Sequence, residues 1–141
     1  EYFTARESVI DLTQTRVNSI SLATQAASIG ATDMSGGTIS DGLYVVMYYA
    51  AITRAATTSS TLTVTLDWQD GGVAHSYTGV AITGNTTATY QSGAPGEGTD
   101  PGPGMVHIDG SSPVRYTTVY GSVGGTPMQY RLFVTLQRVD A

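Results

Sequence analysis

Residues 60–72 read STLTVTLDWQDGG, in which threonine alternates with apolar residues until the chain reaches Asp-Gly-Gly. Successive side chains of a β-strand point to opposite faces of the sheet, so the apolar residues share one face and the polar residues share the other. The apolar face consists of Leu62, Val64, Leu66 and Trp68. Asp70 and the two glycines after it accept the positive φ angles of a tight hairpin turn. The stretch therefore predicts a half-buried antiparallel strand that ends in a turn, with its apolar face directed inward.

The rest of the chain shows the same kind of pattern. Short alternating or apolar segments are separated by turns rich in Gly, Asn, Pro and Ser, and helical periodicity is nearly absent after residue 17. The segments predicted as strands are 18–23, 42–54, 60–70, 73–77, 80–83, 86–91, 105–109, 114–120 and 128–139. Short strands at this spacing are typical of sandwiches and barrels. We predict an all-β fold, an antiparallel two-sheet β-sandwich of jelly-roll type with an N-terminal arm. An immunoglobulin-like sandwich is the alternative.

The length of 141 residues is that of a single domain, whose core can form without disulfides. We expect residues 1–17 to form the N-terminal arm and residues 18–141 to form one β-sandwich domain. The arm has too few paired apolar positions to fold on its own, yet it carries four large apolar side chains that are costly to expose. We predict that these four side chains contact a partner: Tyr2, Phe3, Val9 and Ile10.

Residues 42–54, GLYVVMYYAAITR, form the most apolar run of the chain. One face of this predicted strand carries Leu43, Val45, Met47, Tyr49 and Ala51, and the other carries Tyr44, Val46, Tyr48, Ala50 and Ile52. A strand that is apolar on both faces either lies between two layers of structure or is covered by a partner chain. We favour a central strand between two layers.

The charge balance excludes a large class of partner. The chain has 6 arginines, no lysine and 11 acidic residues, which gives a formal net charge of −5. A nucleic-acid-binding surface needs a concentrated basic face, so we predict no nucleic-acid partner. No run approaches the roughly 18 apolar residues of a membrane span, so we predict no membrane partner either. Without cysteine the chain has no disulfide, no thiolate zinc site and no cysteine nucleophile.

Two histidines and two aspartates are candidates for metal binding. His75 and His107 match no known ligand spacing, and we expect them to be two separate strand or surface histidines. Asp67 and Asp70 flank Trp68 near a turn, where they could bind calcium. However, this loop lacks the dense oxygen ligands of calcium sites, and aspartate is common in hairpin turns. We therefore predict no metal and no cofactor.

Catalytic residues are not predicted either. Glycoside hydrolysis needs two carboxylates across a cleft. Glu97 and Asp100 lie together in a Gly- and Pro-rich loop, residues 93–104, which cannot hold a fixed separation unaided. The chain also lacks the Gly-x-Ser-x-Gly nucleophile elbow and the phosphate-binding loop. We expect a protein that is not an enzyme.

Tyrosine is abundant, with 9 copies, and some of these rings could form a binding surface. Tyr44 and Tyr48 share one strand face, and Tyr116 and Tyr120 share another. Tyrosines on a flat sheet face can stack on sugars, whereas buried rings fill a core or a subunit contact. We favour the second interpretation.

Three stretches of the chain have a pattern seen in other proteins: residues 20–72, which include GLYVVMYYAAIT (42–53) and TTSSTLTVTLDWQDGG (57–72), TGNTTATYQSG (83–93), and VRYTTVYGSVGGTPMQYRLFVTLQRV (114–139). In these stretches the chain resembles a family of structural proteins encoded by phages and prophages. The resemblance extends over residues 20–139. It implies a β-sandwich in a virion and carries over no site residues.

The resemblance and the composition together suggest a role in assembly. We expect a capsid decoration (cement) protein that forms a homotrimer and binds the major capsid protein or other virion proteins. Its expected location is the virion, on the capsid surface or the tail. A tail or fibre tip domain is the nearest variant. A carbohydrate-binding module that anchors to a host glycan is the alternative from a different class.

Overall fold

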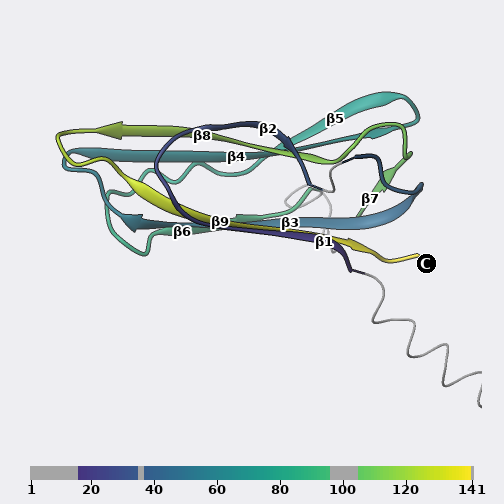
Figure 1. Cartoon of the computed structure of the whole chain (residues 1–141), viewed down its shortest axis with the longest axis horizontal. Coiled ribbons are helices and arrows are strands. Elements are labelled where there is room, and N and C mark those ends of the chain that lie inside the picture. Colours follow the sequence, from purple (N-terminus) through teal and green to yellow (C-terminus); the bar gives the residue numbers. More distant parts are fainter. Residues whose placement is uncertain (1–15, 35–36, 96–104, 141) are drawn as a thin grey trace, which may run out of the picture.

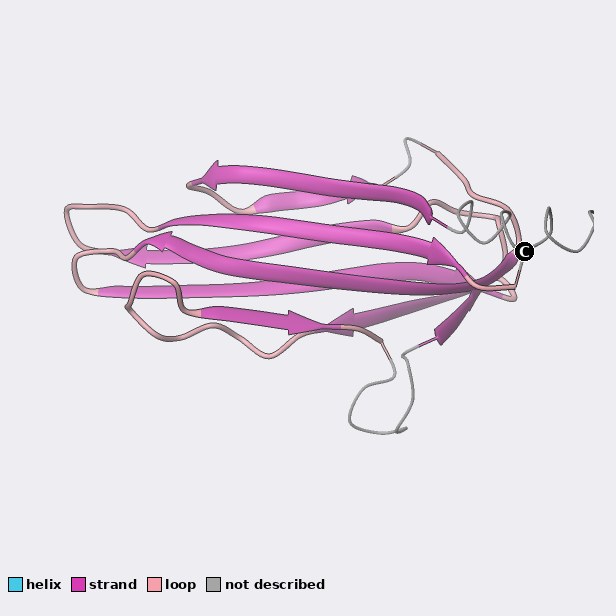
Figure 2. Cartoon of the chain, turned by 90° about the horizontal axis from the view of Figure 1, so that it is seen from below, coloured by secondary structure: helices cyan, strands magenta, loops and turns pink. Residues whose placement is uncertain are grey.

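The computed structural model describes residues 16–34, 37–95 and 105–140, which form two antiparallel β-sheets and contain no helix (Figures 1 and 2). The strands are β1 (Arg16–Gln25), β2 (Ile29–Asp33), β3 (Gly42–Arg54), β4 (Ser59–Asp70), β5 (Val73–Thr78), β6 (Tyr90–Gly93), β7 (Met105–Ile108), β8 (Arg115–Val123) and β9 (Gln129–Arg138). The first sheet has the order β1-β9-β3-β6, with β7 also paired to β3. The second sheet has the order β2-β8-β4-β5 and lies above the first in Figure 1.

The strand pairing has the pattern of a jelly roll. β7 pairs with β3 from Gly42 to Val45 and β6 pairs with it from Tyr48 to Ala51, so the two act as successive parts of one strand. When β6 and β7 are counted as one strand, the pairs are nested: β1 pairs with β9, β2 with β8, β3 with β6 and β7, and β4 with its neighbour β5. This nested pairing is a folded antiparallel ribbon, the double-sheet arrangement of a jelly roll. The predicted all-β, two-sheet sandwich is confirmed.

The alternating stretch that ends in Asp-Gly-Gly forms β4 and the turn into β5. Leu62, Val64 and Leu66 are buried, and Trp68 is partly buried against the same core, as predicted. Gly71 and Gly72 have φ angles of 60° and 77°, which a tight hairpin turn requires. The register Asp70↔Val73 closes the hairpin directly around these two residues.

The core lies between the two sheets and is built from the inward residues of each strand. The buried cluster comprises Met34, Tyr44, Val46, Tyr48, Ala50, Ile52, Ala56, Leu62, Val64, Leu66, Ile82, Ile108, Val114, Tyr116, Met128, Tyr130, Leu132, Val134 and Leu136. Three of the four tyrosines named as a possible sugar surface are therefore core residues, and Tyr120 is partly buried beside them. The interpretation of these rings as core residues is confirmed.

β3 is central within its sheet, between β9 on one side and β6 and β7 on the other. Its inward residues are buried, but Leu43 and Met47 on the outer face are exposed, with no described element over them. The prediction that β3 lies between two layers is therefore wrong. A two-layer sandwich covers only one face of each sheet, so the outer apolar residues of β3 remain accessible.

Other differences from the sequence prediction occur in irregular segments. β2 was not predicted, because its residues are small and polar and show no clear alternation. Residues 80–83 form only an isolated bridge, Leu62↔Ile82, and the predicted strand at 86–91 is instead the shorter β6. The Asn85 side chain attaches this irregular segment to the start of β4 by two hydrogen bonds: its Nδ2 donates to the Ala56 carbonyl, and its Oδ1 accepts from Ser60 Oγ.

The N-terminal boundary differs slightly from the predicted one. β1 begins at Arg16, two residues before the expected start of the sandwich at residue 18. The predicted partner-contact residues Tyr2, Phe3, Val9 and Ile10 lie outside the described residues. Within the described part of the chain, no helix is long and apolar enough to cross a membrane.

Candidate functional site

The outer face of the first sheet carries a group of exposed or partly exposed apolar side chains, here called the apolar face. Alternation along β3, β6, β7 and β9 places them together, because Tyr49 pairs with Phe133 and Val45 pairs with Met105. The residues of the apolar face are Leu43, Val45, Met47, Tyr49, Tyr90, Met105 and Phe133. Contiguous exposed apolar groups are typical of interaction surfaces.

Aromatic contacts organise the centre of this face. The rings of Tyr49 and Tyr90 are stacked, with centroids 5.5 Å apart and planes at 22°. Tyr49 also lies 6.1 Å from the Phe133 ring, and the Arg131 guanidinium lies 5.8 Å from the same ring. Next to them, a shallow hollow of about 200 Å³ is lined by Met47, Tyr48, Tyr49, Phe133 and Thr135. The sequence analysis did not predict Tyr49 and Tyr90 as site residues. The signal for Tyr49 was its position on the second apolar face of the strand at residues 42–54.

A second feature, the Trp68 pocket, is a hollow of about 250 Å³ at the β4–β5 end of the second sheet. Its lining residues are Ala31, Asp67, Trp68, Gln69, Ala74, His75, Ser76, Ser112, Pro113 and Arg115. Trp68 and His75 face each other across β4 and β5, and their rings are stacked with centroids 5.6 Å apart and planes at 14°. Trp68 packs against the core, so the two rings lie on the inner face of the sheet, opposite the side chains of Asp67, Gln69 and Ser76 that line the outer side of the hollow.

Four polar residues cross the second sheet beside this pocket in one row. Asp33 pairs with Arg115, Arg115 pairs with Asp67, and Asp67 pairs with Ser76, so all four side chains share one face. Asp67 alternates with the buried Leu66, which places the row on the outer face. Arg115 Nε donates to Asp33 Oδ1 at 2.7 Å. Among the described residues, none makes a hydrogen bond or an ion pair with the Asp67 carboxylate.

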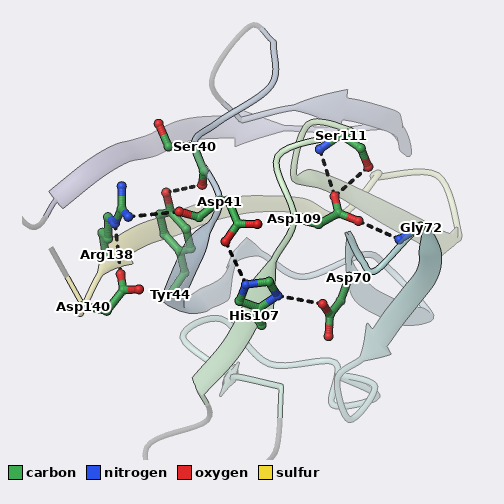
Figure 3. Close-up of polar contacts among 10 residues, drawn as sticks. All are labelled: Ser40, Asp41, Tyr44, Asp70, Gly72, His107, Asp109, Ser111, Arg138 and Asp140. Atoms are coloured by element: carbon green, nitrogen blue, oxygen red, sulfur yellow. Dashed lines mark hydrogen bonds and ion pairs between the residues drawn. The ribbon is translucent and has the colours of Figure 1, made fainter.

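A third feature, the His107 cluster, gathers polar residues where the two sheets meet (Figure 3). The His107 imidazole lies between two carboxylates: Nδ1 is 2.7 Å from Asp70 Oδ1, and Nε2 is 2.9 Å from Asp41 Oδ1. Asp70 ends β4 of the second sheet, whereas His107 belongs to β7 of the first sheet. The hydrogen bond to Asp70, followed by that to Asp41, raises the pKa of His107 above its ordinary value. The imidazole therefore links the two sheets, and its protonated form can donate to both carboxylates.

Asp109 extends this cluster to the β4–β5 turn. Its carboxylate accepts hydrogen bonds from the Gly72 amide at 2.7 Å and from both the amide and the hydroxyl of Ser111. These donors, the Ser111 hydroxyl first, lower the pKa of Asp109 to about 2. The Asp109 amide in turn donates to the Gln69 carbonyl at 3.0 Å. The segment after β7 is thus attached to the hairpin by charged and neutral hydrogen bonds.

Arg138 occupies the other side of the cluster in Figure 3. Its Nη2 donates to the Asp41 carbonyl and its Nε to Asp140 Oδ1, both at 2.9 Å. The hydrogen bond from Arg138 lowers the pKa of Asp140. The guanidinium also lies 5.8 Å from the centroid of the Tyr44 ring, whose hydroxyl donates to the Ser40 carbonyl. These contacts hold the segment that enters β3.

The chemistry open to the His107 cluster is limited by its geometry. Both imidazole nitrogens are occupied by carboxylates, so His107 is not placed to take a proton from a hydroxyl nucleophile. His75 lies against Trp68 instead, so the two histidines are separate, as predicted. No group of three or more His, Asp or Glu suited to a metal ion occurs in the described part of the chain. Glu97 and Asp100 lie outside it.

Comparisons with known proteins give no family for this chain. No protein-family model matches it, and no curated protein matches it. A solved structure described as "Crystal Structure of FLHE" aligns with 86% of this chain and 94% of its own, at 12% sequence identity and a TM-score of 0.32. At this TM-score the likeness does not bear on the function of the chain.

Proposed function

We propose that this chain is a non-enzymatic structural protein of a phage virion, a capsid decoration (cement) protein that forms a homotrimer through its apolar face. The observation that carries the proposal is the exposure of that face. Met47 and Tyr90 are 42% and 61% exposed although they belong to the strands that build the core. Burial of apolar surface contributes roughly 25 cal/mol per Å², so covering such a face favours association.

The charge distribution supports a second copy of the chain as the occupant. Each copy carries a formal net charge of −5, so two copies repel each other except where the contact is uncharged. The residues of the apolar face are all uncharged, and Ser19, Ser21 and Thr135 continue the sheet beside it. An apolar centre with a polar rim has the anatomy of a protein–protein interface.

Two further points support the virion assignment. Double-sheet jelly rolls are common in viral capsid proteins, which is an argument by analogy of fold. The sequence resemblance to phage structural proteins points in the same direction. In this proposal the trimer contact uses the sandwich, and residues 1–17 bind the major capsid protein through Tyr2, Phe3, Val9 and Ile10.

The trimer is tested by light scattering after size-exclusion chromatography. The wild type is expected at three times the mass of one chain, whereas Met47→Asp and Phe133→Asp should elute as single chains with an unchanged β-sheet circular dichroism spectrum. Val119→Asp is the matched control, because Val119 is 61% exposed on the outer face of the other sheet. A wild type that is monomeric at all concentrations would contradict the proposed trimer.

The virion assignment needs a separate measurement on particles of the phage that encodes the chain. A density map should contain three sandwiches around one axis on the capsid surface, with the apolar faces between them. Density for these sandwiches at the tail or a fibre tip would support the nearest variant instead. Particles without any such density would rule out both locations.

A further inference from the structure

We propose that β5 is an interaction edge, at which it pairs antiparallel with β5 of a second copy of this chain. β5 is the last strand of the second sheet and pairs with β4 alone, so its other side is open among the described strands. An open strand edge offers unpaired amides and carbonyls, which another strand can bind. This contact goes beyond the proposed trimer, whose apolar face belongs to the first sheet.

β5 lacks the protection that the other sheet edges have. Natural edges are interrupted by bulges, kept short or made charged. β1 has two register shifts and β2 has one, whereas β6 and β7 have only four residues each. β5 has six residues in unbroken register with β4, from Thr65↔Thr78 to Asp70↔Val73, and contains no Asp, Glu, Arg or Pro. It is therefore the edge best suited to accept another strand.

The hairpin geometry identifies the open groups of β5. Asp70↔Val73 closes a two-residue turn, which makes it a hydrogen-bonded pair. The same phase holds at the other end, where the Gly79 amide donates to the Val64 carbonyl at 3.0 Å. The odd-numbered residues of β5 therefore bond to β4, and the even-numbered ones direct their amides and carbonyls away from it. These are Ala74, Ser76 and Thr78, and no described residue bonds their main-chain groups.

These open groups are complementary to those of a second copy. When two β5 strands lie antiparallel with Ser76 opposite Ser76, Ala74 of each copy lies opposite Thr78 of the other. Each of these pairs exchanges two main-chain hydrogen bonds, so all three residues of both copies are satisfied. Any other register within β5 pairs fewer of the three. The strand therefore specifies one preferred alignment with itself.

The charges also favour a second copy as the occupant. Copies with a net charge of −5 repel each other except where the contact is uncharged, and β5 has no acidic residue. The carboxylate in line with the centre of the pair is Asp67, which lies opposite Ser76 on β4. In the proposed pair the two Asp67 residues are three strand spacings apart, roughly 14 Å. This exceeds the screening length of about 8 Å at physiological ionic strength, so they repel only weakly.

The pairing links copies that are already close together. One pair of six-residue strands covers less surface than the roughly 1,200–2,000 Å² of a stable complex, so the contact is weak in dilute solution. Copies held side by side on a particle have a high effective concentration, at which a weak contact forms. Size-exclusion chromatography of dilute protein should therefore still give the trimer alone.

Disulfide trapping tests the pairing in the full chain, which has no cysteine of its own. Opposite residues of a hydrogen-bonded pair have Cα atoms about 5.5 Å apart, within the range that a disulfide spans. Ser76→Cys should therefore form a covalent dimer in concentrated protein under a glutathione redox buffer, in which disulfides exchange until the favoured ones remain. Non-reducing gel electrophoresis measures the fraction of dimer.

Two further variants test the register. Ala74→Cys alone and Thr78→Cys alone should form little dimer, because each residue lies more than about 13 Å from its own counterpart in the pair. An equal mixture of the two should form dimer, because Ala74 lies opposite Thr78. Val119→Cys is the control for random collision, since Val119 is 61% exposed on the same sheet but belongs to β8, away from the edge.

Ser76→Pro tests the pairing by removing one of its open amides. That amide points away from β4, and proline is tolerated on an edge strand where the N–H faces solvent, so the circular dichroism spectrum should be unchanged. When both chains of the Ala74→Cys and Thr78→Cys mixture carry Ser76→Pro, the fraction of dimer should fall to the level of Val119→Cys.

Three outcomes would overturn the proposal. The first is no more dimer from Ser76→Cys than from Val119→Cys, which would leave the edge to a strand of another protein. The second is as much dimer from Ala74→Cys alone as from the mixture. The third is a dimer that Ser76→Pro leaves unchanged. Failure here leaves the trimer test unaffected, because that test depends on Met47 and Phe133 of the apolar face.

Discussion

The hydroxyl oxygen of Thr118 lies 2.8 Å from that of Tyr130, and this buried contact joins β8 of the second sheet to β9 of the first. The Tyr130 hydroxyl donates its proton to the Ala27 carbonyl at 2.8 Å, so Thr118 must be the donor to Tyr130. Thr118 Oγ1 in turn accepts from the Ile29 amide at 2.8 Å. Burial raises the pKa of Tyr130, which keeps its hydroxyl neutral and able to donate.

Tyr130→Phe should lower the free energy of unfolding by about 1–3 kcal/mol, because it leaves the buried Thr118 hydroxyl without its acceptor and the Ala27 carbonyl without its donor. Thr118→Val should have a similar cost, since it removes the acceptor of the Ile29 amide. The double variant should lose less than the sum of the two singles, because both remove the same contact. Urea unfolding of all four proteins measures this coupling.

The control for this cycle is Thr65→Val. Thr65 and Thr78 also share a hydroxyl contact, at 3.0 Å, but it lies on the exposed side of β4 and β5. Its loss should cost less than about 0.5 kcal/mol, as surface changes usually do. Strict additivity of Tyr130→Phe and Thr118→Val would contradict the buried connection.

Gly79→Ala should destabilise the fold through a steric clash. A Cβ atom at Gly79 would lie 1.9 Å from Tyr48 Oη and 2.6 Å from its Cζ atom. Tyr48 is only 3% exposed, and the Gly79 amide donates to the Val64 carbonyl at 3.0 Å, so neither ring nor backbone moves freely. We expect a loss of about 1–3 kcal/mol in unfolding free energy, as for other overpacked cores.

The matched substitution is Gly30→Ala in β2, where an added Cβ would meet nothing within 4 Å. This variant should unfold within about 0.5 kcal/mol of the wild type in the same urea titration. If Gly79→Ala is equally harmless, the close approach of Tyr48 to the backbone at residue 79 is not rigid.

The Asp109 carboxylate should stabilise the folded state when it is ionised and should lose this effect in acid, when it is protonated. Its pKa is lowered to about 2 in the folded protein, so its contribution is present above the unfolded value near 3.8 and is lost as the pH falls through about 2. Thermal unfolding of wild type and Asp109→Asn should therefore differ most at neutral pH. The difference should narrow between about pH 4 and pH 2.

Ser111→Ala provides the second arm of this experiment. The Ser111 hydroxyl is the strongest donor to Asp109, so its removal should move the pKa of Asp109 back toward the ordinary value. In the Ser111→Ala background, the stability difference caused by Asp109→Asn should be smaller at neutral pH, and its narrowing should be complete at a higher pH than in the wild type. A wild-type difference that stays constant down to pH 2 would show that Asp109 titrates normally.

His107 should titrate above its ordinary pKa, and Asp70 should contribute more than Asp41 to that shift. The order follows from the contacts, since the Asp70 hydrogen bond is the larger cause. Imidazole proton signals followed by NMR should show a lower His107 pKa in Asp70→Asn and a smaller decrease in Asp41→Asn. The His75→Gln variant assigns the two imidazole signals, and equal effects of the two asparagine variants would contradict this order.

The same interaction predicts how the stability contributed by the cluster depends on pH. A raised histidine pKa stabilises the folded state fully below the unfolded value near 6.5, and this stabilisation is lost as the pH rises through the folded value. The unfolding midpoints of wild type and His107→Gln should therefore converge above about pH 6.5. Midpoints that diverge as the pH rises would reverse the sign of this linkage.

The regular strands could be predicted from the sequence because their alternation reports burial directly. Leu62, Val64 and Leu66 alternate with threonines, and all three are core residues. β2 could not be predicted in this way, because it is held largely by backbone pairing with β8 rather than by an apolar face. The segment at 80–89 has strand-like residues but forms only the Leu62↔Ile82 bridge, and the Asn85 side chain bonds the Ala56 carbonyl within it.

The candidate sites depend on long-range pairing and were less accessible to prediction. Asp70 and Asp41 precede His107 by 37 and 66 residues along the chain, and only the nested strand order brings the three together. The apolar face was visible as the second apolar side of β3, but its partners on β6 and β9 required the register. For the Trp68 pocket, the sequence indicated the aromatic ring and the neighbouring aspartates but not the row that Arg115 completes.

The position of β9 between β1 and β3 has a consequence for how the chain folds as it is synthesised. β1 has no partner, and β3 has β6 and β7 along one edge only, until Gln129–Arg138 has left the ribosome. β2 and β4 similarly wait for β8, so the β4–β5 hairpin is the largest unit that can form early by local contacts. Folding dominated by such distant pairings is slow, and the waiting strands expose unpaired edges that can join other chains. The nascent protein is therefore at its greatest risk of aggregation immediately before its last strand is complete.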